Sequence, residues 1–352
     1  MMGGTMMSRP TNSARQPPSG WLKITTLDAH TAGEPLRIVT GGFPEIPGGT
    51  ILEKRRYVRE NLDHLRKTLM WEPRGHADMY GCVITEPVTA GSHLGVLFLH
   101  NEGYSSMCGH GIIALATAVC ECGLVPLPDD LKTLRIDTPA GVVEATPHWK
   151  GERVGSVSFQ NVPSFVYALD RRVDVPGVGE VACDVAFGGA YYAFCRAEDL
   201  GVRLVREDFR MLIDLGMRVK RAVMAMLPIR HPFEEDLGFL YGTIIMGPAH
   251  DAGHFGRNVC VFADGEVDRS PTGTGVSARA ALHAAKGEIA LGEPFVIESI
   301  LGTCFTGRAV RRTTFGPHEA VIPEVTGSAH LTGKNEFWID PADPLGHGFI
   351  LR

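Results

Sequence analysis

The chain has 352 residues, of which 44% are hydrophobic and 21% charged, as in a globular protein large enough for two domains. Its formal net charge of −6 excludes the basic surface by which proteins bind nucleic acids or anionic membranes. No apolar run approaches the roughly 20 residues that a membrane-spanning helix needs. We therefore expect a globular protein with neither a nucleic-acid nor a membrane partner.

The first residues are rich in Ser, Pro, Gly and Met and lack hydrophobic periodicity, so residues 1–20 are predicted to form a disordered tail. This tail has no apolar core of the kind found in signal peptides. Eight cysteines without a regular framework favour a reducing compartment, and hence the cytoplasm. Cys120 and Cys122 would point to different faces of a helix, and no His-Glu-x-x-His pattern occurs, so no metal site is predicted.

Beyond the tail, short strands rich in Val, Ile and Phe alternate with glycine-containing turns. Charged amphipathic helices are predicted over residues 54–70 and 206–227. Two further helices follow glycine-rich turns. The first, over residues 112–120, is apolar all round and should be buried, with Gly123 just beyond its end. The second, over residues 276–285, is rich in small residues and is followed by Gly287.

The two glycine-rich helix starts belong to a longer internal repeat, because the segments around them match in the same order in both halves of the chain. Asp28 is followed by Gly33 as Asp184 is by Gly189, and segment 80–87 aligns without gaps with segment 241–248. Further matches pair 94–99 with 258–262 and 136–141 with 297–302. We therefore predict two similar halves, over residues 21–160 and 161–335, with the crossover at 160–166.

The repeat predicts an α+β fold in which a mostly antiparallel sheet or barrel surrounds a central helix in each half. Segment 336–352 has no partner in the repeat and is expected to return to the first half. A pseudo-two-fold axis would bring the two glycine-rich helix starts together in the cleft between the halves. Free backbone N–H groups and the positive helix ends would then make a carboxylate site there.

The two helix starts differ at one position that matters chemically, since Cys108 precedes the first and Thr272 the second. A helix N-terminus is expected to lower the pKa of Cys108 and make it a usable thiolate base, whereas a threonine cannot ionise near neutral pH. The sequence thus predicts a carboxylate-binding site with one working base. The alternative is that Cys108 is merely a small buried side chain at a domain interface.

These paired motifs resemble the signature of the proline racemase family, and the resemblance extends from about residue 22 to the end of the chain. The first motif is Cys108-Gly109-His110-Gly111, and the second is Asp268-Arg269-Ser270-Pro271-Thr272-Gly273-Thr274-Gly275. Racemases and epimerases of the family carry a second cysteine at the position of Thr272. A threonine there is characteristic of the trans-3-hydroxy-L-proline dehydratase branch, which segments 72–76 and 99–106 also resemble.

The resemblance implies a fold like that of diaminopimelate epimerase, with no metal and no organic cofactor. It implies that Cys108 is the catalytic base and that Thr272 lies opposite it. It further implies that Asp268 holds the ring nitrogen of the substrate. The substrate-binding pairs implied at the two helix starts are Gly109 with His110 and Gly273 with Thr274. Whether His110 transfers protons or only caps and packs is left open.

The implied reaction is the dehydration of trans-3-hydroxy-L-proline to Δ1-pyrroline-2-carboxylate by a hydro-lyase. Two alternatives stay open, namely a 4-hydroxyproline 2-epimerase or proline racemase, and a non-catalytic amino-acid-binding protein on the same fold. A homodimer is a reasonable expectation for such a fold. No residue in the sequence can be assigned to selection of the 3-hydroxyl group.

Overall fold

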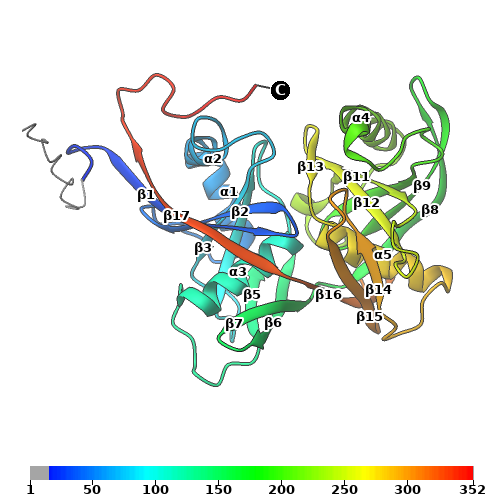
Figure 1. Ribbon diagram of the computed structural model, residues 1–352, viewed down its shortest axis with the longest axis horizontal. Helices are drawn as coiled ribbons and strands as arrows, with labels where there is room; N and C mark the ends of the chain where they lie inside the picture. The colour runs from blue at the N-terminus through cyan, green and yellow to red at the C-terminus, as the bar shows by residue number, and fades with distance from the viewer. Residues whose placement is uncertain (1–15, 352) are drawn as a thin grey trace, which may run out of the picture.

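The computed structural model describes residues 16–351, so residues 1–15 of the predicted tail lie outside the described part of the chain. The molecule has two lobes joined by a long strand (Figure 1). The helices are α1 (Ile51–Asn61), α2 (Asp63–Met70), α3 (Gly109–Cys122), α4 (Phe209–Met226) and α5 (Gly273–Lys286).

The strands occupy most of the remaining chain. They are β1 (Leu22–Thr31), β2 (Glu34–Gly41), β3 (Tyr80–Thr85), β4 (Leu94–His100), β5 (Leu134–Thr138), β6 (Gly141–Lys150), β7 (Arg153–Gln160), β8 (Ser164–Val175), β9 (Gly179–Phe187), β10 (Tyr191–Arg196), β11 (Leu240–Gly247), β12 (Gly256–Phe262), β13 (Glu266–Asp268), β14 (Phe295–Glu298), β15 (Cys304–Phe315), β16 (His318–Gly327) and β17 (Ala329–Ile339).

Each lobe is a closed barrel wrapped around one helix. In the second lobe, β8 pairs with β9 and the ladder continues through β10, β11, β12, β14, β15 and β16 back to β8. In the first lobe, the ladder runs from β17 through β1 and on to β7. This barrel closes because β7 pairs with β16, which continues into β17. Most pairs are antiparallel, as predicted.

The chain crosses between the two barrels twice. After β7 the chain passes at residues 161–163 into β8 of the second barrel, and after β16 it passes at Ser328 into β17, which pairs with β1 of the first barrel (Figure 1). Strand β17 therefore has β8 as its counterpart, and the predicted final segment overlaps β17 only at residues 336–339. The return to the first half also begins at Ala329, ahead of the predicted residue 336.

The two central helices are the buried centres of their barrels. In α3 every residue from Gly109 to Val119 is buried, and in α5 every residue from Gly273 to His283. Both end where predicted, because Gly123 and Gly287 adopt the left-handed conformation that terminates a helix without steric cost. The predicted helix over residues 54–70 is instead two helices, since the backbone leaves the helical conformation at Leu62.

The repeat extends to the side chains that brace the barrels. The Asp137 carboxylate accepts hydrogen bonds from the backbone N–H groups of Val88 and Thr89, at 2.7 and 2.9 Å. In the second half, the Glu298 carboxylate accepts bonds from His250 and Asp251 in the same way, at 2.9 and 3.0 Å. These equivalent acids agree with the duplication predicted from the sequence.

The gap-free alignment of 80–87 with 241–248 is wrong by one residue. Tyr80 lies within a regular ladder opposite His100. In the second half the pairing slips, because Tyr191 pairs with Leu240 but Tyr192 pairs with Gly242. Tyr241 is thus an extra, bulged residue, and a bulge redirects the side chain that it carries.

The two barrels meet where α3 and α5 begin, and only glycine fits at this contact. A Cβ atom built on Gly109 would lie 2.6 Å from the Gly273 Cα, and one built on Gly273 would lie 2.7 Å from the Gly109 Cα. Both distances are far below van der Waals contact, and both obstacles are backbone atoms that cannot rotate away. The close approach of the two helix starts therefore depends on these two glycines.

We predict that Gly273→Ala separates the helix starts and lowers stability by about 1–3 kcal/mol, the usual cost of overpacking a tight site. The thermal unfolding midpoint should fall. The matched control is Gly333→Ala on β17, where an added Cβ meets no atom within 4 Å. Equal midpoints for the two variants would contradict the predicted steric contact.

Candidate active site

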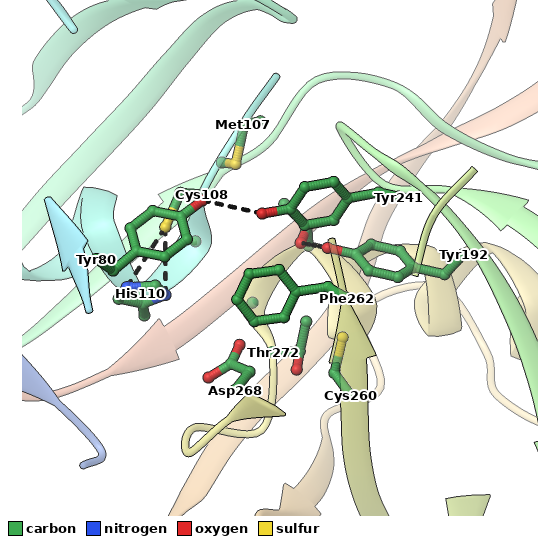
Figure 2. A pocket seen from close by; sticks show the side chains of 13 residues that line it. Tyr80, Met107, Cys108, His110, Tyr192, Tyr241, Cys260, Phe262, Asp268 and Thr272 are labelled. Atoms are coloured by element: carbon green, nitrogen blue, oxygen red, sulfur yellow. Dashed lines mark hydrogen bonds between the residues drawn. The ribbon is translucent and has the colours of Figure 1, made fainter. Parts of the chain in front are cut away.

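A small cavity lies at the contact between the two helix starts, with about 20 Å³ of space for the centre of a water molecule. All seven predicted site residues line it, and both lobes contribute (Figure 2). The lining residues are Tyr80, Met107, Cys108, Gly109, His110, Tyr192, Tyr241, Cys260, Phe262, Asp268, Thr272, Gly273 and Thr274.

Cys108 is the N-cap residue of α3. Its backbone is extended, and its Sγ accepts a hydrogen bond of 3.2 Å from the Gly111 N–H group. The thiol thus occupies the position at which a side chain most often satisfies a free helix N–H group. Only 4% of the residue is exposed.

The expected lowering of the Cys108 pKa is contradicted. Burial raises the pKa of this thiol well above its ordinary value, and the negative charges of Asp268 and Glu34 add to the rise. The Gly111 hydrogen bond lowers the pKa, but the loss of water around the sulfur outweighs it. In the ligand-free site Cys108 is therefore a protonated thiol, and it becomes a base only after it loses that proton.

His110 stands next to the thiol, with its Nδ1 3.2 Å from the Cys108 Sγ. Burial lowers the pKa of His110 to about 3, so the imidazole is neutral. A neutral imidazole has one nitrogen that accepts a proton and one that donates. The ring also packs edge-on against Tyr80, at 4.8 Å between centroids. The neutral His110 ring is thus placed to accept a hydrogen bond from the Cys108 thiol.

Thr272 holds the equivalent N-cap position of α5, but in a different conformation. Its φ of +68° is rare for a β-branched residue, so the backbone is strained at this point. The Thr272 hydroxyl is buried, and it lowers the pKa of Asp268 and of Cys260. The second helix start therefore presents a polar but non-ionising group to the cavity.

Backbone N–H groups converge on the cavity from both helices. Those of Gly109 and His110 belong to the first turn of α3, and those of Gly273 and Thr274 to the first turn of α5. First-turn N–H groups have no acceptor within their own helix, and the positive end of the helix dipole lies there. Two such ends facing one small cavity make a site for a carboxylate.

Two buried acids lie beside this anion site. Asp268 ends β13, and its Oδ1 accepts a 2.7 Å bond from the Ser270 N–H group. Burial raises the pKa of Asp268 to about 6, although this bond lowers it. Glu34 is fully buried, and burial together with the charge of Asp268 raises its pKa well above its usual range. The Glu34 Oε2 accepts a 2.7 Å bond from the Arg269 N–H group, which ties the first lobe to the second.

Several cavity residues were not predicted from the sequence, among them three tyrosines, Tyr80, Tyr192 and Tyr241. Tyr80 and Tyr241 each begin a repeated Tyr-Gly pair, and this repeat was the one sequence pattern that could have marked them as site residues. Glu34 directly follows Gly33 of the repeat, but nothing in the sequence marks it as buried. Its burial follows from the hairpin between β1 and β2, which closes over the start of α5.

A family model described as proline racemase matches residues 26–350 of the chain. The chain belongs to the proline racemase family. A relative from Colwellia psychrerythraea, named trans-3-hydroxy-L-proline dehydratase, is 50% identical over 94% of this chain and 94% of its own length. A relative from Burkholderia multivorans, named 3-hydroxyproline 2-epimerase, is 46% identical over 94% of this chain and 98% of its own.

Among solved structures of the family, a hydroxyproline epimerase from Agrobacterium vitis, with bound trans-4-hydroxy-L-proline, superposes with a TM-score of 0.88. It is 29% identical, and the match covers 94% of this chain and 96% of the other. This match and the paired barrels confirm the predicted α+β fold of the diaminopimelate epimerase type.

Over residues 16–351, no helix has the length and apolar character required to cross a bilayer. In the same residues, His, Cys and acidic side chains form no group of three that could hold a metal ion.

Proposed function

We propose that this protein is a trans-3-hydroxy-L-proline dehydratase, a hydro-lyase that uses Cys108 as its base. The observation that carries the proposal is the pair of helix starts, in which Cys108 and Thr272 line one small cavity. One side of the cavity can transfer a proton and the other cannot. The name of the Colwellia psychrerythraea relative supports the same assignment.

The substrate carboxylate would lie between the two helix starts, where it accepts hydrogen bonds from first-turn N–H groups of both. The ring ammonium would lie next to Asp268, whose buried carboxylate supplies the opposite charge. Neutralising the carboxylate makes the Cα proton easier to remove, because the electron pair left on Cα then spreads into it.

The positive ammonium also offsets the negative charges that raise the pKa of Cys108 in the empty site. We infer that substrate binding favours loss of the thiol proton to solvent, whereas the buried His110 imidazole 3.2 Å away, with its pKa of about 3, stays neutral. The resulting thiolate removes the Cα proton.

With Thr272 on the far side, no thiol reprotonates Cα with inversion. The carbanion instead expels the hydroxyl on C3, which gives an enamine that tautomerises to Δ1-pyrroline-2-carboxylate. In trans-3-hydroxy-L-proline the hydroxyl lies on the same face of the ring as the Cα hydrogen. The elimination is therefore syn, and the leaving oxygen departs on the Cys108 side.

An epimerase is the second candidate, because the Burkholderia multivorans relative carries the name 3-hydroxyproline 2-epimerase. Proton NMR in D2O separates the candidates when trans-3-hydroxy-L-proline, trans-4-hydroxy-L-proline and L-proline are each incubated with the protein. A dehydratase consumes the 3-hydroxy compound alone and forms pyrroline-2-carboxylate. Epimerised 3- or 4-hydroxyproline or D-proline would favour the second candidate, and no change in any compound would favour a binding protein.

We predict that Cys108→Ser loses nearly all turnover, because a serine hydroxyl does not ionise in this site. The rate of pyrroline-2-carboxylate formation measures the loss. A matched control is Cys304→Ser, which changes an exposed cysteine outside the cavity and should retain activity. A Cys108→Ser variant that kept a tenth of the wild-type rate would remove the thiolate from the mechanism.

We predict that Thr272→Cys introduces some inversion at Cα, because a thiol would then face each side of the substrate ring. The measurement is the appearance of D-configured, Cα-deuterated product from L-proline in D2O. Deuterium exchange with complete retention of configuration would contradict the opposed placement of the two residues.

We predict that L-proline binds more weakly as the pH falls below about 6. Asp268 has a raised pKa of about 6, so it is protonated and uncharged below that pH and charged above it. Affinity measured by calorimetry should fall about tenfold per pH unit below 6, the slope for one proton. In Asp268→Asn the affinity should be low and independent of pH in this range, and an unchanged pH profile would exclude Asp268.

A cytoplasmic location and a homodimeric state remain predictions from the sequence. All eight cysteines are free thiols, which supports a reducing compartment.

A further inference from the structure

The mechanism above leaves two buried tyrosine hydroxyls in the cavity unused. The Tyr80 hydroxyl donates a 2.7 Å hydrogen bond to the Ser105 Oγ and lies 3.3 Å from the Tyr241 hydroxyl. A separation of 3.3 Å is long for a bond between hydroxyls, which usually measures 2.7–2.8 Å. The Tyr80–Tyr241 pair can therefore take up another oxygen at little cost.

This tyrosine pair lies on the Cys108 side of the cavity. The Tyr80 side chain lowers the pKa of the Cys108 thiol, and both residues line the cavity. Tyr241 stacks on Phe262, with ring centroids 5.3 Å apart, and its hydroxyl points toward Tyr80 (Figure 2). The third tyrosine differs, because the Tyr192 hydroxyl is bonded at 2.7 Å to the Thr274 Oγ1 on α5.

The orientation of the substrate follows from the groups that hold its charges. Its carboxylate lies at the helix starts and its nitrogen faces Asp268. The ring nitrogen and C3 are both attached to Cα, so C3 points away from Asp268. Figure 2 shows the hydroxyls of Tyr80 and Tyr241 across the cavity from the Asp268 carboxylate. A 3-hydroxyl on the Cys108 face of the ring is thereby directed at the tyrosine pair.

We propose that the Tyr80–Tyr241 pair binds the 3-hydroxyl of the substrate and protonates it as it leaves. The inference rests on the proposed dehydratase function and assigns the residues that select the 3-hydroxyl. Both residues touch the substrate in this arrangement and are catalytic residues.

The protons balance over one turnover. The Cα–H bond breaks and its proton moves to the Cys108 Sγ, while the electron pair forms the Cα–C3 double bond. The C3–O bond then breaks, and the leaving oxygen takes a proton from the tyrosine pair. The Cys108 thiol returns a proton to the pair through the Tyr80 hydroxyl. Cys108 is again a thiolate, both tyrosines are neutral, and one water leaves.

A buried hydroxyl pair also explains selection between substrates. A substrate without an oxygen at C3 leaves the long 3.3 Å contact between the two hydroxyls in place and gains no hydrogen bond from them. Sites built to bond a substrate hydroxyl discriminate against analogues that lack it. The pair is thus a specificity determinant as well as a proton source.

The test replaces each hydroxyl alone, in Tyr80→Phe and Tyr241→Phe. In D2O, NMR follows two rates with trans-3-hydroxy-L-proline, namely dehydration and deuteration of Cα in the remaining substrate. Loss of a preorganised donor should slow dehydration about a hundredfold. Cys108 would still remove and return the Cα proton, so the ratio of deuteration to dehydration should rise about tenfold or more.

A second substrate isolates the leaving-group step. Fluoride leaves without a full proton transfer, so trans-3-fluoro-L-proline should be eliminated by both variants with a much smaller loss than the hydroxy substrate. The matched control is Tyr192→Phe, which removes a cavity hydroxyl on the α5 side. Because Tyr192 bonds Thr274, both rates are expected to fall together, and the ratio of deuteration to dehydration should equal that of the wild type.

The outcomes are distinct. If Tyr80→Phe and Tyr241→Phe lose deuteration, dehydration and fluoride elimination to the same extent, the tyrosines are structural and the inference is overturned. Dehydration by these variants at the wild-type rate would also overturn it. A wild-type protein that does not dehydrate trans-3-hydroxy-L-proline would instead overturn the proposed function. Thermal unfolding midpoints close to the wild type identify variants that are folded.

Discussion

The contact between Gly109 and Gly273 is the constraint on which the site depends. Because neither residue has a side chain, the two helix starts approach until their backbones touch. The first-turn N–H groups of both helices then face one small cavity, and their positive ends add at the same place. A methyl group on either residue would separate the barrels and open the anion site.

Two crossings of the chain hold the two barrels in this relation. Strand β8 follows directly after β7 of the first barrel, and β17 follows directly after β16 of the second barrel and pairs with β1 of the first. Glu34 adds a further link, since it lies in the first lobe and accepts a hydrogen bond from Arg269 of the second. The cavity is therefore formed by two covalently linked halves, of which the first is completed by a strand from the end of the chain.

Burial sets the protonation states of the side chains in the site. Exclusion of water raises the pKa of Cys108 and of Asp268 and lowers that of His110. The empty site thus holds a neutral thiol and a neutral imidazole beside acids that ionise reluctantly. The proposed substrate brings a positive ring nitrogen and a negative carboxylate into the site. Its binding is thereby coupled to formation of the Cys108 thiolate.

The sequence by itself determined the duplication, the two buried helices with their glycine ends, and the residues at the helix starts. These features are local, because N-caps, helix ends and repeats follow from the order of residues along the chain. It also located the difference between Cys108 and Thr272.

Only the tertiary structure decided the protonation of Cys108, the burial of Glu34 and the convergence of Tyr80 with Tyr241. The helix-start argument gave the wrong direction for the thiol pKa, because the loss of water depends on every element packed around the sulfur. The Tyr241 bulge is likewise set by pairing between β10 and β11, strands that a long segment separates in the chain. Interactions between distant segments, which no local pattern encodes, fixed these parts of the site.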